Sequence, residues 1–216
     1  MPSTLRCAGI LFDCDGVLVD SQPVIDRVLR EWAAAHGLDA RRVPELSRGR
    51  RDVELVRLAA PWLGADAEAR RLEEREPAEV DGLAEVPGAR RLLCALPAGR
   101  WAVVTSGGGA LVRTRLRAAA LPEPRVVISA DDVREGKPHP EGCLAAARAL
   151  GVDPADCVVF EDSPAGVAAG KAAGARVVGV GTAPGRSRPP AGLWIGDLRD
   201  VAFVGDGRDI VLEIAG

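Results

Sequence analysis

The stretch Ile10-Leu11-Phe12-Asp13-Cys14-Asp15-Gly16-Val17-Leu18-Val19-Asp20 ends an apolar run in two aspartates that one residue separates. The run predicts a buried strand, so Asp13 and Asp15 come where that strand reaches the surface. Residues i and i+2 of an extended chain point to the same side, which places both carboxylates on one face. Such like charges need a cation between them or a proton on one of them. Alone they are ordinary loop aspartates; signals farther along the chain favour a Mg²⁺ site or a general acid beside a nucleophile.

The composition is typical of a globular protein. The 216 residues are 47% hydrophobic and 27% charged, which suits one large domain or a domain with a sizeable insert. The net charge of -3 and the lack of a large basic face argue against nucleic acid as a partner and favour a small molecule. We expect a monomer or a weak dimer.

Cysteine usage and hydropathy bear on the compartment. The five cysteines are scattered, form no CxxC pair and lie mostly in apolar runs, which is typical of reduced thiols in a cytoplasmic protein. The N-terminus lacks a signal-peptide pattern, and no apolar stretch approaches the ~18 residues of a membrane span. Tyrosine is absent and His36 and His139 are the only imidazoles, so the chemistry must rely on carboxylates, lysine and hydroxyls.

Short apolar runs alternate with helical patterns along most of the chain. Because strands that alternate with helices form parallel sheets, this order predicts an α/β fold with ligands at the carboxyl ends of the strands. The expected strands are 8–12, 101–104, 126–129, 157–160 and 176–180. The expected helices between them are 86–96, 110–120, 140–150 and 164–173.

One segment breaks the alternation. It is helical throughout, with helices expected at 23–36, 51–62 and 66–76, and it directly follows the first strand. An insert at that point would lie over the carboxyl end of the sheet as a lid above Asp13 and Asp15. A helical subdomain without a catalytic part is the alternative. We therefore predict a core of residues 1–20 and 86–216 and a helical cap of residues 21–85.

The last residues predict an antiparallel hairpin. Apolar runs at 201–204 and 210–214 flank Gly205-Asp206-Gly207-Arg208-Asp209. Its Asp-Gly pair is typical of a tight turn between two strands.

Polar groups also follow the second expected strand. Thr105 and Ser106 precede Gly107-Gly108-Gly109 at the start of a helical pattern. A hydroxyl beside free backbone amides at a helix start can bind an anion, although such a turn is also a common way to begin any helix. No GK[ST] follows, so the segment is not a Walker A loop.

Two later segments add charge. Lys137 lies in Gly136-Lys137-Pro138-His139-Pro140, where two prolines stiffen the backbone around it, although a loop lysine is usually just solvated. Glu161 and Asp162 directly follow an apolar strand, and adjacent buried acids are costly unless a cation is nearby. Ser163 or Asp162 can also cap the helix that starts at Pro164.

In the order DxDGV, TSG, GKPHP and EDSPAG, the chain resembles the haloacid dehalogenase-like hydrolase superfamily, and the likeness covers nearly all 216 residues. These motifs are that superfamily's catalytic set. The resemblance implies a Rossmann-like core with a helical cap after the first strand. The segments VVTSG, GKPHPEG and VVFEDSPAGVAAGKAAGA are most similar to its sugar-phosphate and glycerol-phosphate phosphatases.

The resemblance also implies a role for each motif residue. Asp13 would attack phosphorus and form a phosphoaspartyl intermediate, and Asp15 would protonate the leaving group and then activate water. Thr105, Ser106, Gly107 and Lys137 would hold the phosphoryl oxygens. Mg²⁺ would be held by Asp13, by the Asp15 backbone carbonyl and by Asp162, with Glu161 as a direct or an outer ligand.

Substrate choice would lie in the cap, because the core meets only phosphate. Gly49, Arg50 and Arg51 fall where similar phosphatases place a cap loop that enters the site. Arg50 or Arg51 would contact substrate hydroxyls or a second anionic group. Alternatively, these arginines form a solvated turn paired with acids such as Glu45 and Asp52.

The resulting prediction is a Mg²⁺-dependent phosphomonoester hydrolase that acts on a small sugar or polyol phosphate. A hexose-phosphate mutase of the β-phosphoglucomutase type is the main alternative, but similar mutases carry a cap histidine where this chain has Ile25. True haloacid dehalogenases lack the second aspartate of DxD. A receiver domain of a signalling protein would place its acceptor aspartate after the third strand, in a chain about half as long.

Overall fold

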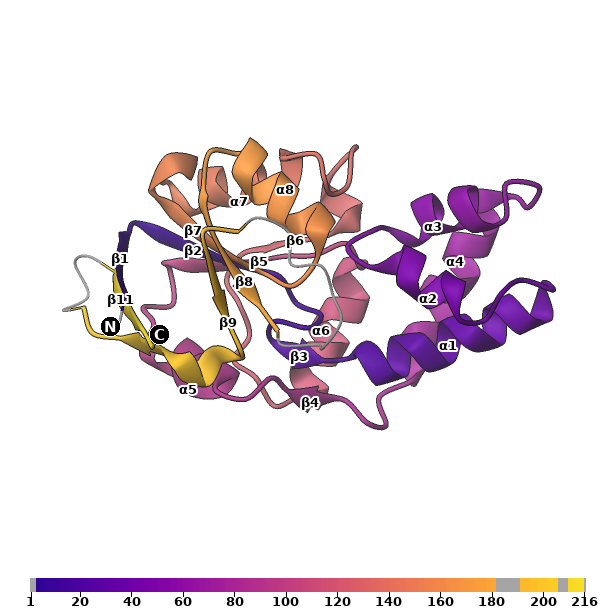
Figure 1. The fold of residues 1–216 in the computed structure, drawn as a ribbon, viewed down its shortest axis with the longest axis horizontal. Coiled ribbons are helices and arrows are strands. Elements are labelled where there is room, and N and C mark those ends of the chain that lie inside the picture. Colours follow the sequence, from indigo (N-terminus) through magenta and orange to yellow (C-terminus); the bar gives the residue numbers. More distant parts are fainter. Residues whose placement is uncertain (1–2, 182–190, 206–209, 216) are drawn as a thin grey trace.

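A parallel sheet forms the centre of the molecule, as the sequence predicts (Figure 1). This computed structural model describes residues 3–181, 191–205 and 210–215, and within them the sheet has six strands in the order β6-β5-β2-β7-β8-β9. Strand β2 therefore lies between β5 and β7, which puts the polar strand ends next to one another. The bounds are β2 Gly9–Phe12, β5 Trp101–Val104, β6 Val127–Ile128, β7 Cys157–Glu161, β8 Arg176–Val180 and β9 Leu193–Ile195.

Helices cover both faces of this sheet. Because successive strand residues point to opposite faces, Ile10 and Phe12 pack in a cluster with residues of α5 and α6, while Leu11 packs with residues of α7 and α8. The rings of Phe12 and Phe160 stack with centroids 5.1 Å apart, which joins β2 to β7. The helices are α5 Ala89–Ala95, α6 Gly109–Ala118, α7 Glu141–Leu150 and α8 Pro164–Ala172.

A group of helices with its own apolar core follows β2 in the chain and lies beyond the carboxyl end of the sheet (Figure 1). They are α1 Gln22–Ala35, α2 Arg42–Ser47, α3 Asp52–Ala59, α4 Ala65–Arg75 and the 3-10 helix η1 Glu76–Ala78. The chain enters and leaves this group through β3 Val19–Asp20 and β4 Ala84–Glu85, which pair antiparallel. The paired entrance and exit support the proposed division into a cap of residues 21–85 and a core.

A second, antiparallel sheet joins the two ends of the chain. Its order is β1-β11-β10, with β1 Ser3–Cys7, β10 Val201–Phe203 and β11 Ile210–Ile214. The predicted C-terminal hairpin is confirmed by the pairing of β10 with β11. Its Asp206-Gly207 turn lies outside the described residues. The pairing of β1 with β11 was not predicted, because it joins segments that are distant in sequence.

Element boundaries differ from the prediction where proline and glycine intervene. Helix α3 ends at Ala59 rather than at Trp62, because Ala60 precedes Pro61 and a residue before proline avoids the helical region. Helix α5 begins at Ala89, after Gly88 in a left-handed conformation. Helix α2 and strands β3, β4 and β9 were missed because they are short. The remaining 3-10 helices are η2 Ala130–Asp132, η3 Pro154–Asp156 and η4 Leu198–Asp200.

The structure also bears on the predictions of reduced cysteines and of no membrane span. All five cysteines lie within the described residues and none forms a disulfide. In the same part of the chain, no helix combines the length and apolar character that crossing a bilayer requires.

The packing of β11 makes a stability prediction. Leu212 is fully buried in the main core cluster, whereas Val204, just after β10, is half exposed. Leu212→Ala should lower the free energy of unfolding by about 2–5 kcal/mol, because it leaves a cavity. Val204→Ala should change it by less than about 0.5 kcal/mol. Urea denaturation of both variants checks this, and equal small effects would show that β11 is not part of the core.

Candidate active site

The carboxyl ends of the neighbouring strands bring the predicted polar residues together. Phe12 pairs in register with Val103 on one side and with Phe160 on the other. Asp13 directly follows β2 and Glu161 is the last residue of β7, so both lie at the same edge of the sheet. Thr105 follows β5 there, and its backbone N–H donates to the carbonyl of Ile128. Adjacent parallel strands therefore deliver the motif residues to one place.

Lys137 lies at the centre of these residues. Its Nζ donates to Asp13 Oδ1 at 2.7 Å and also to the Glu161 carboxylate. Burial alone would lower the pKa of Lys137, but the carboxylates of Asp13 and Glu161 outweigh it and raise the pKa, so the ammonium stays charged. The lysine that the sequence places in an apparently solvated loop is in fact 8% exposed.

Glu161 is held on both carboxylate oxygens. Oε1 accepts from Lys137, and Oε2 accepts from the backbone N–H and the hydroxyl of Ser163, each at 3.0 Å. The Ser163 hydroxyl in turn accepts from the N–H of Gly166 at 3.0 Å, so Ser163 caps helix α8. The donors on Lys137 and Ser163 therefore fix the orientation of the Glu161 carboxylate.

A group of carboxylates at this edge is suited to a divalent cation. Asp13, Glu161 and Asp162 each offer an oxygen within 4.8 Å of the others, and their total charge exceeds that of Lys137. Burial raises the pKa of Asp162 to about 7, and Glu161 adds to the rise while Lys137 opposes it. Gly16 makes room here, because its φ is +82° and a Cβ would lie 2.5 Å from Asp162 Oδ2. Hard oxygen ligands in an uncompensated acidic group fit Mg²⁺.

Asp15 points its carboxylate toward different partners from those of Asp13. Its Oδ1 accepts from the Ser21 hydroxyl at 2.5 Å, and its Oδ2 accepts from Arg115 Nη1 at 2.7 Å. Arg115 Nη2 also donates to Glu76 Oε2 at 3.1 Å. The two aspartates that share one face in an extended chain thus have separate environments.

The segment after β5 forms a loop of polar groups that opens toward the cap. The N–H of Gly107 donates to the Thr105 hydroxyl at 3.1 Å, and the N–H of Gly109 donates to Asp131. The Ser106 hydroxyl donates to the carbonyl of Gly49 at 3.1 Å, which joins this loop to the cap. Thr105, Ser106 and Gly107 all line a cavity together with Asp13 and Asp162.

The cap loop approaches the core at Gly49. Its φ is +68°, and a Cβ there would lie 3.2 Å from the Cβ of Ala165 and would also meet the Ser163 hydroxyl. Glycine therefore satisfies both the left-handed conformation and the close contact.

The arginines after Gly49 have different positions. Arg50 lines the cavity. Arg51 lies outside it, because its guanidinium binds the Glu54 carboxylate and the carbonyls of Val133 and Arg134. Arg51 thus joins the cap to the loop before Lys137, and Arg50 is the one of these two arginines that lines the cavity.

Several cavity residues were missed from the sequence. They are Gln22, Arg48, Asp52, Glu73, Glu76 and Arg115. The spacing could have revealed Arg115, because it lies four residues after Leu111 and three after Val112 on the apolar face of α6. Nothing in one sequence marks the cap residues, because they come from separate helices.

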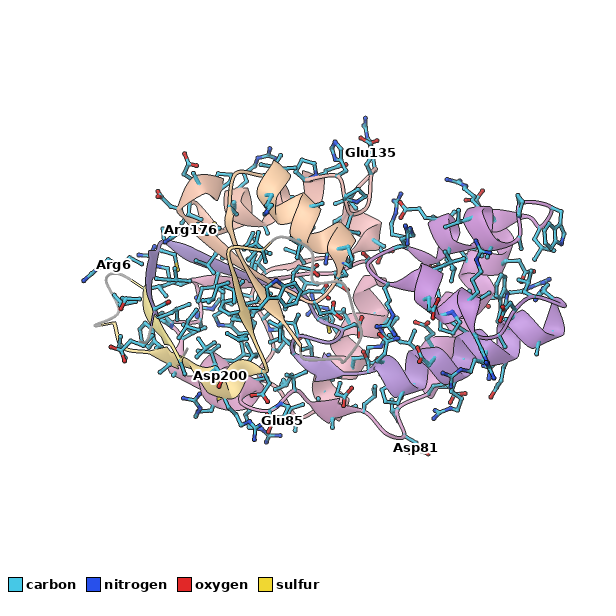
Figure 2. The ribbon with its side chains drawn as sticks, viewed as in Figure 1. Arg6, Asp81, Glu85, Glu135, Arg176 and Asp200 are labelled. Atoms are coloured by element: carbon cyan, nitrogen blue, oxygen red, sulfur yellow. The ribbon has the colours of Figure 1, made fainter. Side chains whose placement is uncertain are left out.

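A second cluster of possible metal-ligand atoms lies outside the cavity. Glu135 and His139, on the loop that carries Lys137, and Glu141, at the start of α7, offer ligand atoms close to one another. Glu135 lies at the outer surface of the core, pointing to solvent (Figure 2). This exposed group is therefore separate from the buried carboxylates at the strand ends.

Comparisons with known proteins agree with this geometry. The family model described as haloacid dehalogenase-like hydrolase matches residues 7–174. Hexitol phosphatase A of Escherichia coli (strain K12) is 44% identical over 82% of this chain and 84% of its own length. Glycerol-1-phosphate phosphohydrolase 2 of Saccharomyces cerevisiae is 37% identical over 84% of this chain and 77% of its own. A hydrolase from Pseudomonas syringae has a structure with a TM-score of 0.77 and 26% identity, covering 90% of this chain and 95% of that one.

The family model and the relatives show the family, and the sheet order and the buried lysine between carboxylates agree with it. The chain therefore belongs to the haloacid dehalogenase-like hydrolase family.

Proposed function

We propose that this chain is a Mg²⁺-dependent phosphomonoesterase that acts on a small polyol or sugar phosphate. The observation that carries the proposal is the buried contact between Lys137 and Asp13, whose carboxyl lines a polar cavity. Lys137 holds one carboxylate oxygen of Asp13 and leaves the other for bond formation. This arrangement suits a nucleophile toward a dianionic phosphate, because the fixed ammonium offsets the charge of both groups.

The proposed reaction gives each of the two aspartates a separate role. Asp13 forms a bond to phosphorus as the ester P–O bond breaks, and Asp15 gives its proton to the departing alkoxide. A water molecule then attacks phosphorus, its proton passes to Asp15, and the bond between phosphorus and Asp13 breaks to release inorganic phosphate. Thr105, the amide of Ser106 and Lys137 hold the phosphoryl oxygens in both steps, and the Gly107 amide orients the Thr105 hydroxyl.

The carboxylates present fit Mg²⁺. Asp13 and Asp162 would hold the ion together with the Asp15 backbone carbonyl, while Glu161 would lie behind them, because Lys137 and Ser163 occupy its oxygens. When bound, the ion would neutralise charge on the transferring phosphoryl group.

The cap side of the cavity supports a hydroxyl-rich leaving group. Arg48 Nη1 is buried there without a hydrogen-bond partner among the described residues, and within the same part of the chain no ion pair holds the carboxyl of Asp52. Burial raises the pKa of Asp52, and the nearby Glu76 and Glu73 add to the rise, so its carboxyl can both donate and accept hydrogen bonds. Such groups suit the hydroxyls of a polyol. The two curated relatives are named for hexitol and glycerol-1-phosphate substrates.

The mutase alternative is weaker on a specific observation. Ile25 occupies the position of the mutase cap histidine, and it lines the cavity. An isoleucine there can neither donate nor accept a proton. Ile25 therefore cannot take the role that the cap histidine has in similar mutases, which favours hydrolysis over a second phosphoryl transfer.

Removing the nucleophile tests the mechanism. Asp13→Asn should lower phosphate release at least about 10³-fold, because an amide cannot form the phosphoaspartyl bond. The melting temperature should not fall, since the variant removes a buried negative charge. Asp81→Asn, the same change on an exposed loop (Figure 2), should retain full activity. Substantial turnover by Asp13→Asn would overturn the assignment.

Metal binding should depend on pH. Asp162 must lose its proton to hold Mg²⁺, so a pKa of about 7 predicts that affinity rises with pH across that value. Between pH 6 and pH 8 the gain should be about tenfold. Calorimetric titration of the substrate-free protein with Mg²⁺ measures it, and an affinity independent of pH would contradict the role of Asp162.

Product analysis separates hydrolysis from isomerisation. With Mg²⁺, glycerol phosphate and hexitol phosphates should release inorganic phosphate faster than nucleotide monophosphates do, because the cap offers hydrogen-bonding groups. EDTA should stop the release. Formation of isomerised hexose phosphate without free phosphate would favour the mutase instead.

A further inference from the structure

Arg115 is a buried cation that the proposed reaction does not use. It is 4% exposed and lies on the apolar face of α6 beside Leu111, Val112 and Leu116. Arginine is almost never buried without a partner, because removing its charge from water is costly. The residues that Arg115 contacts should therefore explain why its charge is buried among apolar side chains.

Those contacts join two parts of the molecule. Nη1 binds Asp15 Oδ2 at 2.7 Å, and Nη2 binds Glu76 Oε2 at 3.1 Å. Asp15 belongs to the core, whereas Glu76 lies in η1, in the segment that leaves the cap. One guanidinium thus connects the proposed acid and base to the cap.

The geometry favours a role in orientation. Ser21 holds the other oxygen of Asp15 at 2.5 Å, so both oxygens of that carboxylate are fixed. A guanidinium keeps its proton in proteins and cannot relay it, but its rigid fork can hold two carboxylates in one plane. A lysine in its place would offer one shared nitrogen instead of the two separate nitrogens that reach Asp15 and Glu76.

We propose that Arg115 is a positioning residue that sets the orientation of Asp15 for proton transfer and that Glu76, on the cap, holds Arg115 in place. The proposal rests on the proposed phosphatase function. The step it affects is the transfer of the Asp15 proton to the departing oxygen, as the P–O bond of the ester breaks and the bond to Asp13 forms. The contact between cap and core and the orientation of the Asp15 carboxyl are thereby linked through the Arg115 side chain.

A leaving-group comparison distinguishes this role from a structural one. An alkoxide leaving from glycerol phosphate is strongly basic and needs the proton, whereas 4-nitrophenolate is weakly basic and leaves without it. Loss of orientation should therefore slow the first substrate far more than the second. A general loss of structure would slow both to the same extent.

The experiment uses the full chain with Mg²⁺ in rapid-mixing assays. For Arg115→Met, single-turnover cleavage of glycerol phosphate should fall about 10²-fold. The burst of 4-nitrophenol from 4-nitrophenyl phosphate should change less than about threefold, because that step does not need the acid. Arg91→Met is the matched control, because Arg91 binds backbone carbonyls of residues 198, 199 and 201, none of which lines the cavity. Both of its rates should stay near those of the unmodified chain.

Arg115→Lys keeps the charge and covers the case in which Arg115→Met does not fold. Its cleavage of glycerol phosphate should still fall about tenfold, with the 4-nitrophenol burst retained. A parallel loss on both substrates, or an unchanged rate on glycerol phosphate, would overturn the proposal. If the unmodified chain released no phosphate from any ester, the proposed function would fail instead, so the two failures are distinguishable.

Discussion

The rest of the site depends on the burial of several carboxylates around one lysine at the carboxyl end of the sheet. Asp13, Glu161 and Asp162 lie within a few ångströms of one another, and Lys137 offsets part of their charge. Carboxylates this close repel one another and resist burial, so the arrangement persists because strands β2 and β7 are held by the apolar core beneath them. The core therefore stabilises a group of carboxylates that would be unfavourable by themselves, and the proposed Mg²⁺ would neutralise part of their charge.

The cap completes this arrangement from above. Its loop reaches the core where Gly49 meets Ser106 and Ser163, and Arg51 binds the backbone just before the Lys137 loop. These contacts, with the pair of Glu76 and Arg115, place hydrogen-bonding cap side chains opposite the phosphate site. In the proposed function, recognition of the leaving group is therefore separated in the chain from the chemistry on phosphorus, and the two meet where cap and core are in contact.

Much of the core could be predicted from one sequence, because local patterns determine it. The apolar runs before Asp13 and before Glu161 identify buried strands, and parallel order brings their ends to one edge. Short elements were harder: β3 and β4 are two residues each, and β1 pairs with β11 across almost the whole chain. Such pairings depend on which segments meet in space, and no local pattern records that.

The sequence alone determined the fold class, the order of the motifs and the residue types available for chemistry, because these follow from hydrophobic periodicity and from the position of polar residues at strand ends. Only the tertiary structure decided the partners. It buried Lys137 between Asp13 and Glu161, directed Arg50 to the cavity and Arg51 away from it, and placed Arg115 between Asp15 and Glu76. The physical reason is that hydrogen bonds and ion pairs act over a few ångströms, and residues far apart in sequence come within that distance only after the chain has folded.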